Sequence, residues 1–187
     1  MTVNELPLIG AFGIQPQILE DKRGYFFEWF NLEKFKSQSG VDFTPVQFNS
    51  SRSSRGVLRG LHFQKDPVSQ SKVVGVTHGT IQDVIVDIRE GSPTYGQHYS
   101  EIIDDQKKNQ LYIPKGFAHG FLVLSEEAEI FYAIDNYYSP GNEGGLKFDD
   151  PDLDINWEIE NKKIVLSDKD LTYKPLSAED FNFKYND

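Results

Sequence analysis

The clearest structural signal in the chain is the run IQDVIVDIR at residues 81–89. The character of its side chains alternates, which is typical of a β-strand because successive side chains of a strand point to opposite faces. One predicted face carries Val84, Val86 and Ile88, and the opposite face carries Asp83, Ile85, Asp87 and Arg89. The run therefore predicts a strand with two distinct faces.

Similar strand-like runs lie on both sides of this segment. They cover residues 24–30, 44–50, 57–64, 72–78, 97–103, 110–113, 117–124 and 128–135. Glycine and proline residues stand between the runs, and many short strands separated by such residues favour a sandwich or a barrel. The sequence therefore predicts an all-β (mainly β) fold with few helices.

Two regions depart from the strand pattern. Asn31 is a candidate N-cap of a short helix that ends before Gly40. Residues 150–175 are predicted to be rich in loops, with one short strand near residues 155–157. Ser177 is predicted to cap a final short helix.

The composition indicates a folded domain with an acidic surface. The 187 residues include 14 Phe, 9 Tyr and 2 Trp, which together with the aliphatic residues can fill a sizeable core. The formal net charge of -10 argues against broad nucleic-acid binding, for which a basic patch supplies most of the affinity. Because the chain has no internal repeat or obvious linker, residues 1–187 are predicted to form a single domain.

The absence of certain residues and segments excludes several classes of protein and kinds of site. There is no cysteine, which excludes disulfides, thiol nucleophiles and cysteine-based zinc sites. The first residues contain no basic segment followed by an apolar one, and no apolar run is long enough to cross a membrane. We therefore expect a cytoplasmic protein that binds neither a membrane nor nucleic acid.

The arginines are unevenly distributed. All five lie between Arg23 and Arg89, and Arg52, Arg55 and Arg59 fall within eight residues. Such a cluster has two interpretations: it binds a small anionic ligand, or it is a solvated edge of a strand.

The four histidines are the leading candidates for chemistry, because the chain has neither common type of phosphate-binding glycine loop nor a Gly-x-Ser-x-Gly motif. His62 is the fourth residue of the run RGLHFQ, on a predicted strand. His119 lies in the run PKGFAHG, whose Pro and Gly predict a tight turn that leads into the next strand. His78 and His98 lie beside predicted turns and are expected on the surface.

The run PKGFAHG resembles the second motif of the cupin superfamily, whose members fold as small double-sheet jelly-roll barrels. The first cupin motif normally contains a His-x-His pair, and here Gln64 stands where the second His would follow His62. A catalytic zinc or iron site needs about three protein ligands, and only His62 and His119 are available. We therefore expect a cupin-like barrel with a metal-free pocket, and a metal-dependent dioxygenase is the least favoured alternative.

Nearly the whole chain resembles the dTDP-4-dehydrorhamnose 3,5-epimerase family of sugar-nucleotide epimerases. The matching runs, in order, are DKRGYFFE at 21–28, QFNSS at 47–51, GVLRGLHFQ at 56–64, KVV at 72–74, QDVIVDIR at 82–89, IPKGFAHGF at 113–121, FY at 131–132, YYSP at 137–140 and LSDKD at 166–170. Each run alone is weak evidence, but all of them in this order are highly specific.

The resemblance implies a substrate that is a 4-keto-6-deoxyhexose attached to thymidine diphosphate. A ketone at C4 acidifies the hydrogens on C3 and C5, so a base can remove a proton from one face and an acid can return one to the other. The implied reaction converts dTDP-4-dehydro-6-deoxy-D-glucose to dTDP-4-dehydro-L-rhamnose without a cofactor, as a step in deoxysugar biosynthesis.

The resemblance also implies the catalytic residues. His62 would be the base, Asp170 its orienting partner, Tyr132 the acid that returns the proton, and Lys72 the cation beside the enolate. Asp83 is an alternative partner for His62, because its side chain can also point into the predicted barrel.

Ten further residues resemble family contacts to the nucleotide-sugar. They are Arg23, Phe26, Glu28, Gln47, Asn49, Arg59, His119, Tyr138, Glu143 and Lys169. By resemblance, Arg23, Arg59 and Lys169 contact mostly the diphosphate, which suits the planar fork of arginine. Tyr138 would stack on the thymine. Family members are homodimers that exchange N-terminal strands, so Phe26 or Phe27 would reach the site of the neighbouring subunit.

Two other functions remain open. A single-carbon epimerase would act at C3 or C5 of a related dTDP-4-keto or amino-keto sugar with the same base and acid. A catalytically silent module that binds sugar nucleotides would be indicated by loss of His62 or Tyr132, and both residues are present.

Overall fold

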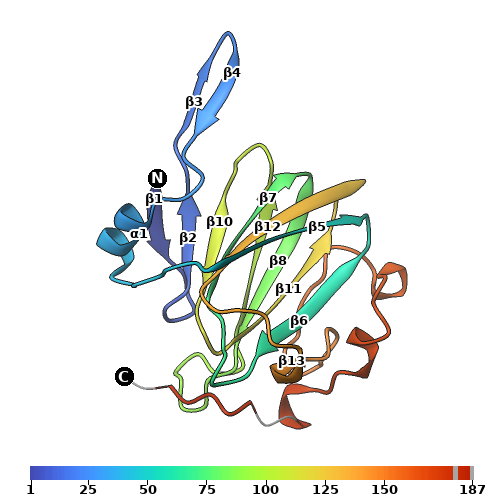
Figure 1. Ribbon diagram of the computed structural model, residues 1–187. Helices are drawn as coiled ribbons and strands as arrows, with labels where there is room; N and C mark the ends of the chain where they lie inside the picture. Colours follow the sequence, from blue (N-terminus) through green and yellow to red (C-terminus); the bar gives the residue numbers. More distant parts are fainter. Residues whose placement is uncertain (179–180, 186–187) are drawn as a thin grey trace.

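Two antiparallel β-sheets lie face to face in the computed structural model, which describes residues 1–178 and 181–185 (Figure 1). One sheet contains, in spatial order, β1 (Thr2–Glu5), β2 (Phe12–Gln15), β10 (Gln110–Ile113), β7 (Lys72–His78), β12 (Glu127–Ile134) and β5 (Gln47–Ser54). The other contains β13 (Glu143–Gly145), β6 (Leu58–Gln64), β11 (Phe117–Val123), β8 (Thr80–Asp87) and β9 (His98–Asp104). This arrangement confirms the predicted mainly β, double-sheet fold.

A separate hairpin, formed by β3 (Ile18–Asp21) and β4 (Gly24–Phe27), projects away from the two sheets (Figure 1). It pairs with no other strand among the described residues. Its side chains include several large apolar groups that are exposed, namely Leu19, Tyr25 and Phe26. An isolated two-stranded hairpin is marginally stable in water, so this one depends on contacts beyond its own strands.

The helix α1 (Leu32–Ser39) begins and ends where the sequence predicts. The side chain of Asn31 accepts a hydrogen bond from the backbone N–H of Lys34, and Gly40 ends the helix with a φ of 74°. The part of the chain that the structure describes also contains four short 3-10 helices: η1 (Pro140–Asn142), η2 (Asn161–Lys163), η3 (Asp170–Thr172) and η4 (Leu176–Ala178). No helix in the described part of the chain is long and apolar enough to cross a membrane.

The space between the sheets is filled by apolar side chains from both of them. Val74 and Ile130 of the six-stranded sheet pack in one cluster with Ile85 of β8. Val84 and Val86 belong to a second cluster, on the outer face of the same strand. The two faces predicted for residues 81–89 are therefore confirmed.

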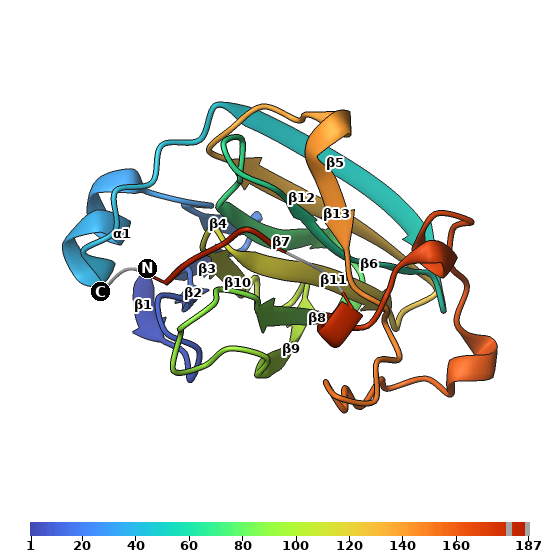
Figure 2. The ribbon, with the colours of Figure 1, turned by 90° about the horizontal axis from the view of Figure 1, so that it is seen from below.

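The outer face of the five-stranded sheet is covered, and that of the six-stranded sheet is covered in part. Trp157 and Phe183 from the loop-rich C-terminal segment pack with Val86 on the five-stranded sheet. Figure 2 shows residues 146–178 beside this sheet, on the side away from α1. On the six-stranded sheet, Phe35 of α1 packs against Tyr112, with ring centroids 4.9 Å apart.

Two predicted strands have different boundaries in the structure. The strand expected at 44–50 begins only at Gln47, because Pro45 has no backbone N–H to donate to a neighbouring strand. The strand expected at 24–30 ends at Phe27. The chain then turns to the barrel, where the ring of Trp29 lies 4.7 Å from that of Phe131.

The prediction of a strand near residues 155–157 is wrong. The polar groups of this segment bond to other partners: Trp157 Nε1 donates to the Phe148 carbonyl at 2.9 Å, and the Asn156 carbonyl accepts from Gln82 Nε2 at 2.8 Å. Ser177 lies inside η4 and does not cap it. The sequence pattern also misses four short strands, namely β1, β2, β3 and β13.

Candidate active site

His62 on β6 and Asp170 at the start of η3 form a hydrogen-bonded pair. His62 Nε2 lies 2.5 Å from Asp170 Oδ1, and Ser167 Oγ donates to Asp170 Oδ2 at 2.8 Å. Burial would raise the pKa of the Asp170 carboxyl. The hydrogen bond and the electrostatic interaction with His62, together with hydrogen bonds from Ser167, hold this pKa below its ordinary value. A charged carboxylate in this position fixes the tautomer and orientation of the imidazole.

His119 on β11 lies directly opposite His62 in the pairing of β11 with β6. Its Nε2 is 2.8 Å and 3.0 Å from the two carboxyl oxygens of the buried Asp83. Burial lowers the pKa of His119 by more than Asp83 raises it, so the neutral imidazole is favoured. Of the two carboxylates considered for His62, Asp83 therefore pairs with His119 and Asp170 pairs with His62.

A pair of glycines allows β6 and β11 to approach closely enough for this arrangement. Gly60 has a φ of 134°, and a Cβ at this position would lie 2.5 Å from Gly120 Cα and 2.9 Å from the His119 carbonyl oxygen. No larger residue fits without moving a strand. The same region of β11 contains a register shift between His119 and Phe121.

Lys72 and Tyr132 approach the same cavity from the six-stranded sheet. Burial lowers the pKa of Lys72 to about 8, although Asp83, Glu143 and Asp135 oppose this shift. Tyr132 lies on β12, and its hydroxyl is 2.7 Å from Ser51 Oγ. Burial raises the pKa of Tyr132, so the phenol is protonated near neutral pH.

The cavity itself has a volume of about 250 Å³. Its lining comes from both sheets and consists of Asn49, Arg59, His62, Gln70, Lys72, His119, Phe121, Tyr132, Ile134 and Tyr138. Arg59 makes no ion pair with a carboxylate among the described residues, whereas Arg52 pairs with Glu127 on the surface. Of the two interpretations of the arginine cluster, Arg59 therefore fits the anion site and Arg52 fits the solvated edge.

Five of the predicted binding residues form a connected chain of hydrogen bonds and one ion pair that runs from the rim to the cavity lining. The backbone N–H of Tyr138 donates to Gln47 Oε1 at 3.1 Å, and Tyr138 Oη donates to Glu143 Oε2 at 2.6 Å. Lys169 Nζ lies 2.6 Å from the same Glu143 oxygen. Gln47 Nε2 also donates to Asn49 Oδ1 at 2.8 Å, which connects the rim to the cavity lining.

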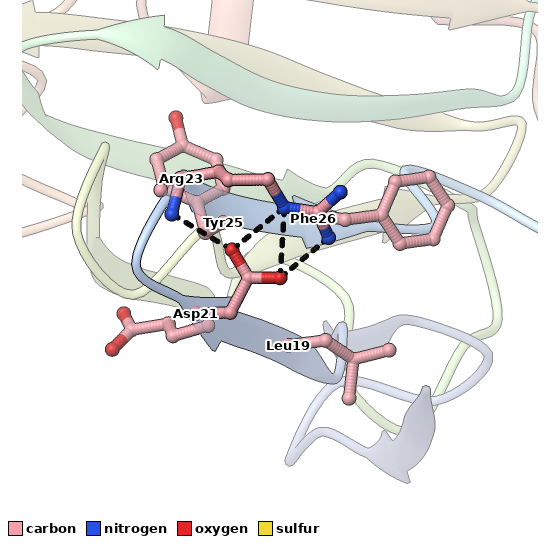
Figure 3. A pocket seen from close by; sticks show the side chains of 7 residues that line it. Leu19, Asp21, Arg23, Tyr25 and Phe26 are labelled. Carbon is pink, nitrogen blue, oxygen red and sulfur yellow. Dashed lines mark hydrogen bonds and ion pairs between the residues drawn. The ribbon is translucent and has the colours of Figure 1, made fainter.

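Three predicted binding residues lie away from both the cavity and its rim. Figure 3 shows Arg23 on the hairpin, where its guanidinium donates hydrogen bonds to the Asp21 carboxylate. The shortest of these contacts is 2.5 Å. Phe26 is on the same hairpin and is 69% exposed. Glu28 accepts from Lys34 at 2.8 Å beside α1. Within one chain, the structure does not bring these three residues to His62.

The other two histidines do not line the cavity. His78 is exposed, as predicted, and lies 3.5 Å from Asp105. His98 is half-buried at the start of β9, so it is less exposed than the sequence suggests.

Sequence reasoning missed three cavity residues, but strand periodicity could have found two of them. Phe121 follows His119 by two positions and Ile134 follows Tyr132 by two, so each shares the face of a predicted site residue. Gln70 lies in a loop, where no periodic pattern exists. It is held by a hydrogen bond from Nε2 to the Asn136 carbonyl at 2.8 Å.

The arrangement can move a proton beside a polarised carbonyl. His62 comes from one sheet and Tyr132 from the facing sheet, so a base and a protonated acid flank the same space, with the cation of Lys72 beside it. Among residues 1–178 and 181–185, no group of three or more His, Asp and Glu side chains is placed to hold a metal ion.

The fold and the site together define a double-sheet cupin-type barrel equipped for acid-base chemistry. The family model described as dTDP-4-dehydrorhamnose 3,5-epimerase matches residues 5–178. The chain therefore belongs to the dTDP-4-dehydrorhamnose 3,5-epimerase family. It is 44% identical over 170 residues to the enzyme of that name from Methanothermobacter thermautotrophicus, covering 90% of this chain and 91% of the relative.

Solved structures agree with this assignment. A dTDP-6-deoxy-D-glucose-3,5-epimerase from Legionella pneumophila Philadelphia 1, in complex with dTDP-4-keto-L-rhamnose, is 40% identical with a TM-score of 0.95, over 100% of this chain and 99% of that one. A 3'-monoepimerase from Streptomyces bikiniensis, in complex with dTDP-quinovose, is 36% identical with a TM-score of 0.85, over 92% and 86% of the two chains.

Proposed function

We propose that this enzyme epimerises dTDP-4-dehydro-6-deoxy-D-glucose at C3 and C5 to give dTDP-4-dehydro-L-rhamnose, as a single epimerase domain that uses no cofactor. The observation that carries the proposal is the cavity in which the His62–Asp170 pair faces Tyr132 across the barrel, with Lys72 between the same sheets. The relatives named 3,5-epimerase, including one solved with dTDP-4-keto-L-rhamnose, support the choice of substrate.

The proposed reaction proceeds in two proton transfers at each carbon. His62, oriented by Asp170, removes the hydrogen next to the ketone, and the electron pair moves onto the ketone oxygen as an enolate. The ammonium group of Lys72 stabilises that oxygen. Tyr132 then gives its proton to the opposite face of the same carbon, which inverts its configuration and leaves a phenolate.

The proposed binding mode places the nucleotide over the rim of the cavity. Arg59 and Lys169 would contact the diphosphate, and the exposed ring of Tyr138 would stack on thymine. Gln47 and Glu143 hold Tyr138 by the hydrogen bonds described above. Asn49 and His119 would contact the sugar from the cavity lining.

The test is to incubate the enzyme with dTDP-4-keto-6-deoxyglucose in deuterated water and to follow C3 and C5 by NMR. We expect deuterium at both carbons and a product of the 4-keto-L-rhamnose series. The variant His62→Ala should abolish exchange at both carbons while its circular dichroism stays that of the parent. Exchange at neither carbon in the folded parent enzyme would refute the proposed reaction on this substrate.

A second candidate function is epimerisation at one carbon only. The similarity to a 3'-monoepimerase, at 36% identity, favours keeping it, because that protein shares the fold of this chain. The same NMR experiment separates the two functions, since a single-carbon enzyme would place deuterium at C3 or C5 but not at both in its product.

We also propose that the enzyme is a cytoplasmic homodimer in which the β3–β4 hairpin reaches the site of the second subunit. The exposed apolar side chains of the hairpin and its projection from the barrel support this assembly (Figure 1). Arg23 and Phe26 would then complete the binding site of the neighbouring subunit. Light scattering should give twice the chain mass of 21.4 kDa.

A further inference from the structure

The inner face of β5, the edge strand of the six-stranded sheet, presents a row of polar side chains to the site. Residues 47, 49, 51 and 53 alternate with outward-facing ones. Gln47, Ser51 and Ser53 each contact a different site residue, and Asn49 lines the cavity and accepts from Gln47 Nε2. Ser53 Oγ accepts from Arg59 Nε at 3.0 Å, and Ser51 Oγ lies 2.7 Å from Tyr132 Oη. Ser51 is thus in direct contact with the group proposed to return the proton.

The direction of the hydrogen bond between Ser51 and Tyr132 matters for catalysis. A phenol has one proton, and if it donated this proton to Ser51 it could not direct it at a carbon in the cavity. If Ser51 donates, the phenolic proton is free to point into the cavity that Tyr132 lines. Among the described residues, Ser51 is the only hydrogen-bond partner of the Tyr132 hydroxyl.

We propose that Ser51 is a positioning residue for the return of the proton: it donates its hydroxyl hydrogen to Tyr132 Oη and so directs the phenolic proton at the sugar. This inference rests on the proposed function, in which Tyr132 is the acid. When Tyr132 transfers its proton to carbon, the phenolate that forms keeps the hydrogen bond from Ser51. Hydrogen bonds to a charged group are stronger than those to a neutral one, so this contact favours the transfer.

The pKa of Tyr132 supports the same role for Ser51. Burial raises the pKa of Tyr132, and the hydrogen bond from Ser51, followed by the charge of Arg59, lowers it. Without Ser51 the phenol would remain buried but would be a weaker acid, with its proton free to rotate. Removal of a proton by His62 does not involve Ser51. Loss of the Ser51 hydroxyl should therefore slow the return of the proton by Tyr132 but not its removal by His62.

The test is the variant Ser51→Ala in deuterated water, with the parent substrate and NMR detection. We expect a fall of roughly tenfold in kcat for product, consistent with loss of one hydrogen bond to a charged state. Exchange of deuterium into unepimerised substrate should continue at close to the parent rate, because His62 can still remove the proton and return a deuteron to the same face. The ratio of exchange to inversion therefore rises. Ser51→Thr, which keeps the hydroxyl on a residue suited to a strand, should restore the parent ratio.

The neighbouring residue supplies a matched control. Ser50 points to the opposite face of β5, where its hydroxyl donates to Glu129 at 3.1 Å, so Ser50→Ala should leave both rates unchanged. An unchanged ratio in Ser51→Ala, or an equal fall in exchange and product, would overturn the role of Ser51 while the epimerase function stands. Absence of exchange and product in the parent enzyme would instead refute the proposed function itself.

Discussion

Lys72 is a residue at which burial and neighbouring charge act in opposite directions. Burial lowers its pKa to about 8 against the opposing carboxylates of Asp83, Glu143 and Asp135. In the proposed mechanism the protonated ammonium stabilises the enolate, so Lys72 would act below its pKa and lose its charge as the pH rises. We predict that kcat falls above about pH 8, as measured by the pH dependence of epimerisation.

A substitution distinguishes Lys72 from other groups that titrate at alkaline pH. In Lys72→Arg the guanidinium stays protonated over this range, so the residual activity should extend to higher pH. His78→Ala, at an exposed residue away from the cavity, should keep the parent profile. The assignment fails if the alkaline limb of Lys72→Arg coincides with that of the parent.

For single residues, the sequence predicts which ones line the cavity better than it predicts which side chains hydrogen bond to each other. His62, Lys72 and Tyr132 are found in the cavity as the family resemblance implies. The choice between Asp83 and Asp170 as partner of His62 could not be derived from strand alternation, because Asp170 arrives from a loop that packs on the barrel from far along the chain. Only the packing of that loop places its carboxylate 2.5 Å from the imidazole.

The close pairing of β6 with β11 depends on Gly60. In Gly60→Ala the new methyl group would meet backbone atoms of β11 at 2.5 Å, and the φ of 134° is unfavourable for any residue with a Cβ. Backbone strain and overpacking together should lower the free energy of unfolding by about 2–5 kcal/mol. Urea unfolding measures this loss, and activity should fall with it because His62 and His119 lie on the two strands.

A second glycine shows whether the loss at Gly60 is specific. Gly141 has open space around its Cβ position and an ordinary φ, so Gly141→Ala should change stability by less than about 0.5 kcal/mol. Equal stability of the two variants would show that the two strands can separate without cost.

Asp87 at the end of β8 holds a buried network. Its carboxylate accepts from Arg89 Nη2 at 2.7 Å, Ser92 Oγ at 2.6 Å and Thr94 Oγ1 at 2.7 Å. Burial would raise the pKa of Asp87, but these hydrogen bonds hold it below the ordinary value. We predict that Asp87→Asn lowers the free energy of unfolding at pH 7 by about 2–4 kcal/mol.

The pH dependence of this effect has a definite sign. Because the pKa of Asp87 is lower in the folded state, its contribution is fully present above the unfolded pKa of about 3.9 and is lost as the pH falls through the folded value. The difference between parent and Asp87→Asn in urea unfolding should therefore shrink below about pH 4. Asp42→Asn, at an exposed ion pair with Lys36, should be close to neutral at both pH values.

Strand prediction succeeded for most strands of the two sheets and missed four strands of three or four residues each. Residues 110–113 and 81–89 coincide closely with β10 and β8. β13 is a three-residue strand of sequence Glu-Gly-Gly, which has no periodic apolar pattern and is held by its pairing with β6. A strand of this kind forms because a neighbouring strand pairs with it. The residues of the strand itself do not show which neighbour that is, so the sequence alone does not predict it.

At the scale of the whole molecule, the position of Arg23 leads to a test with two inactive variants. If the hairpin serves the second subunit, a mixed dimer of Arg23→Ala and His62→Ala chains contains one complete site, with His62 from one chain and Arg23 from the other. Coexpression should then restore about a quarter of the parent activity, since half of randomly formed dimers are mixed and each has one working site.

Each variant expressed alone provides the baseline for this experiment. Each variant alone should have little activity, because every site then lacks either His62 or Arg23. If Arg23 instead served its own chain, no pairing of the two variants would create a complete site, and activity after coexpression would stay at that baseline.

The separation of His62 and Asp170 along the chain also bears on how the enzyme is synthesised. A ribosome adds about 5–20 residues per second from the N-terminus, so His62 emerges well before Asp170, which is 108 positions later. β6 and β11 can pair in a nascent chain, but the imidazole lacks its carboxylate until the C-terminal loops have folded over the five-stranded sheet. Activity of a partly translated or shortened chain therefore reports completion of its final loops, and not formation of the barrel.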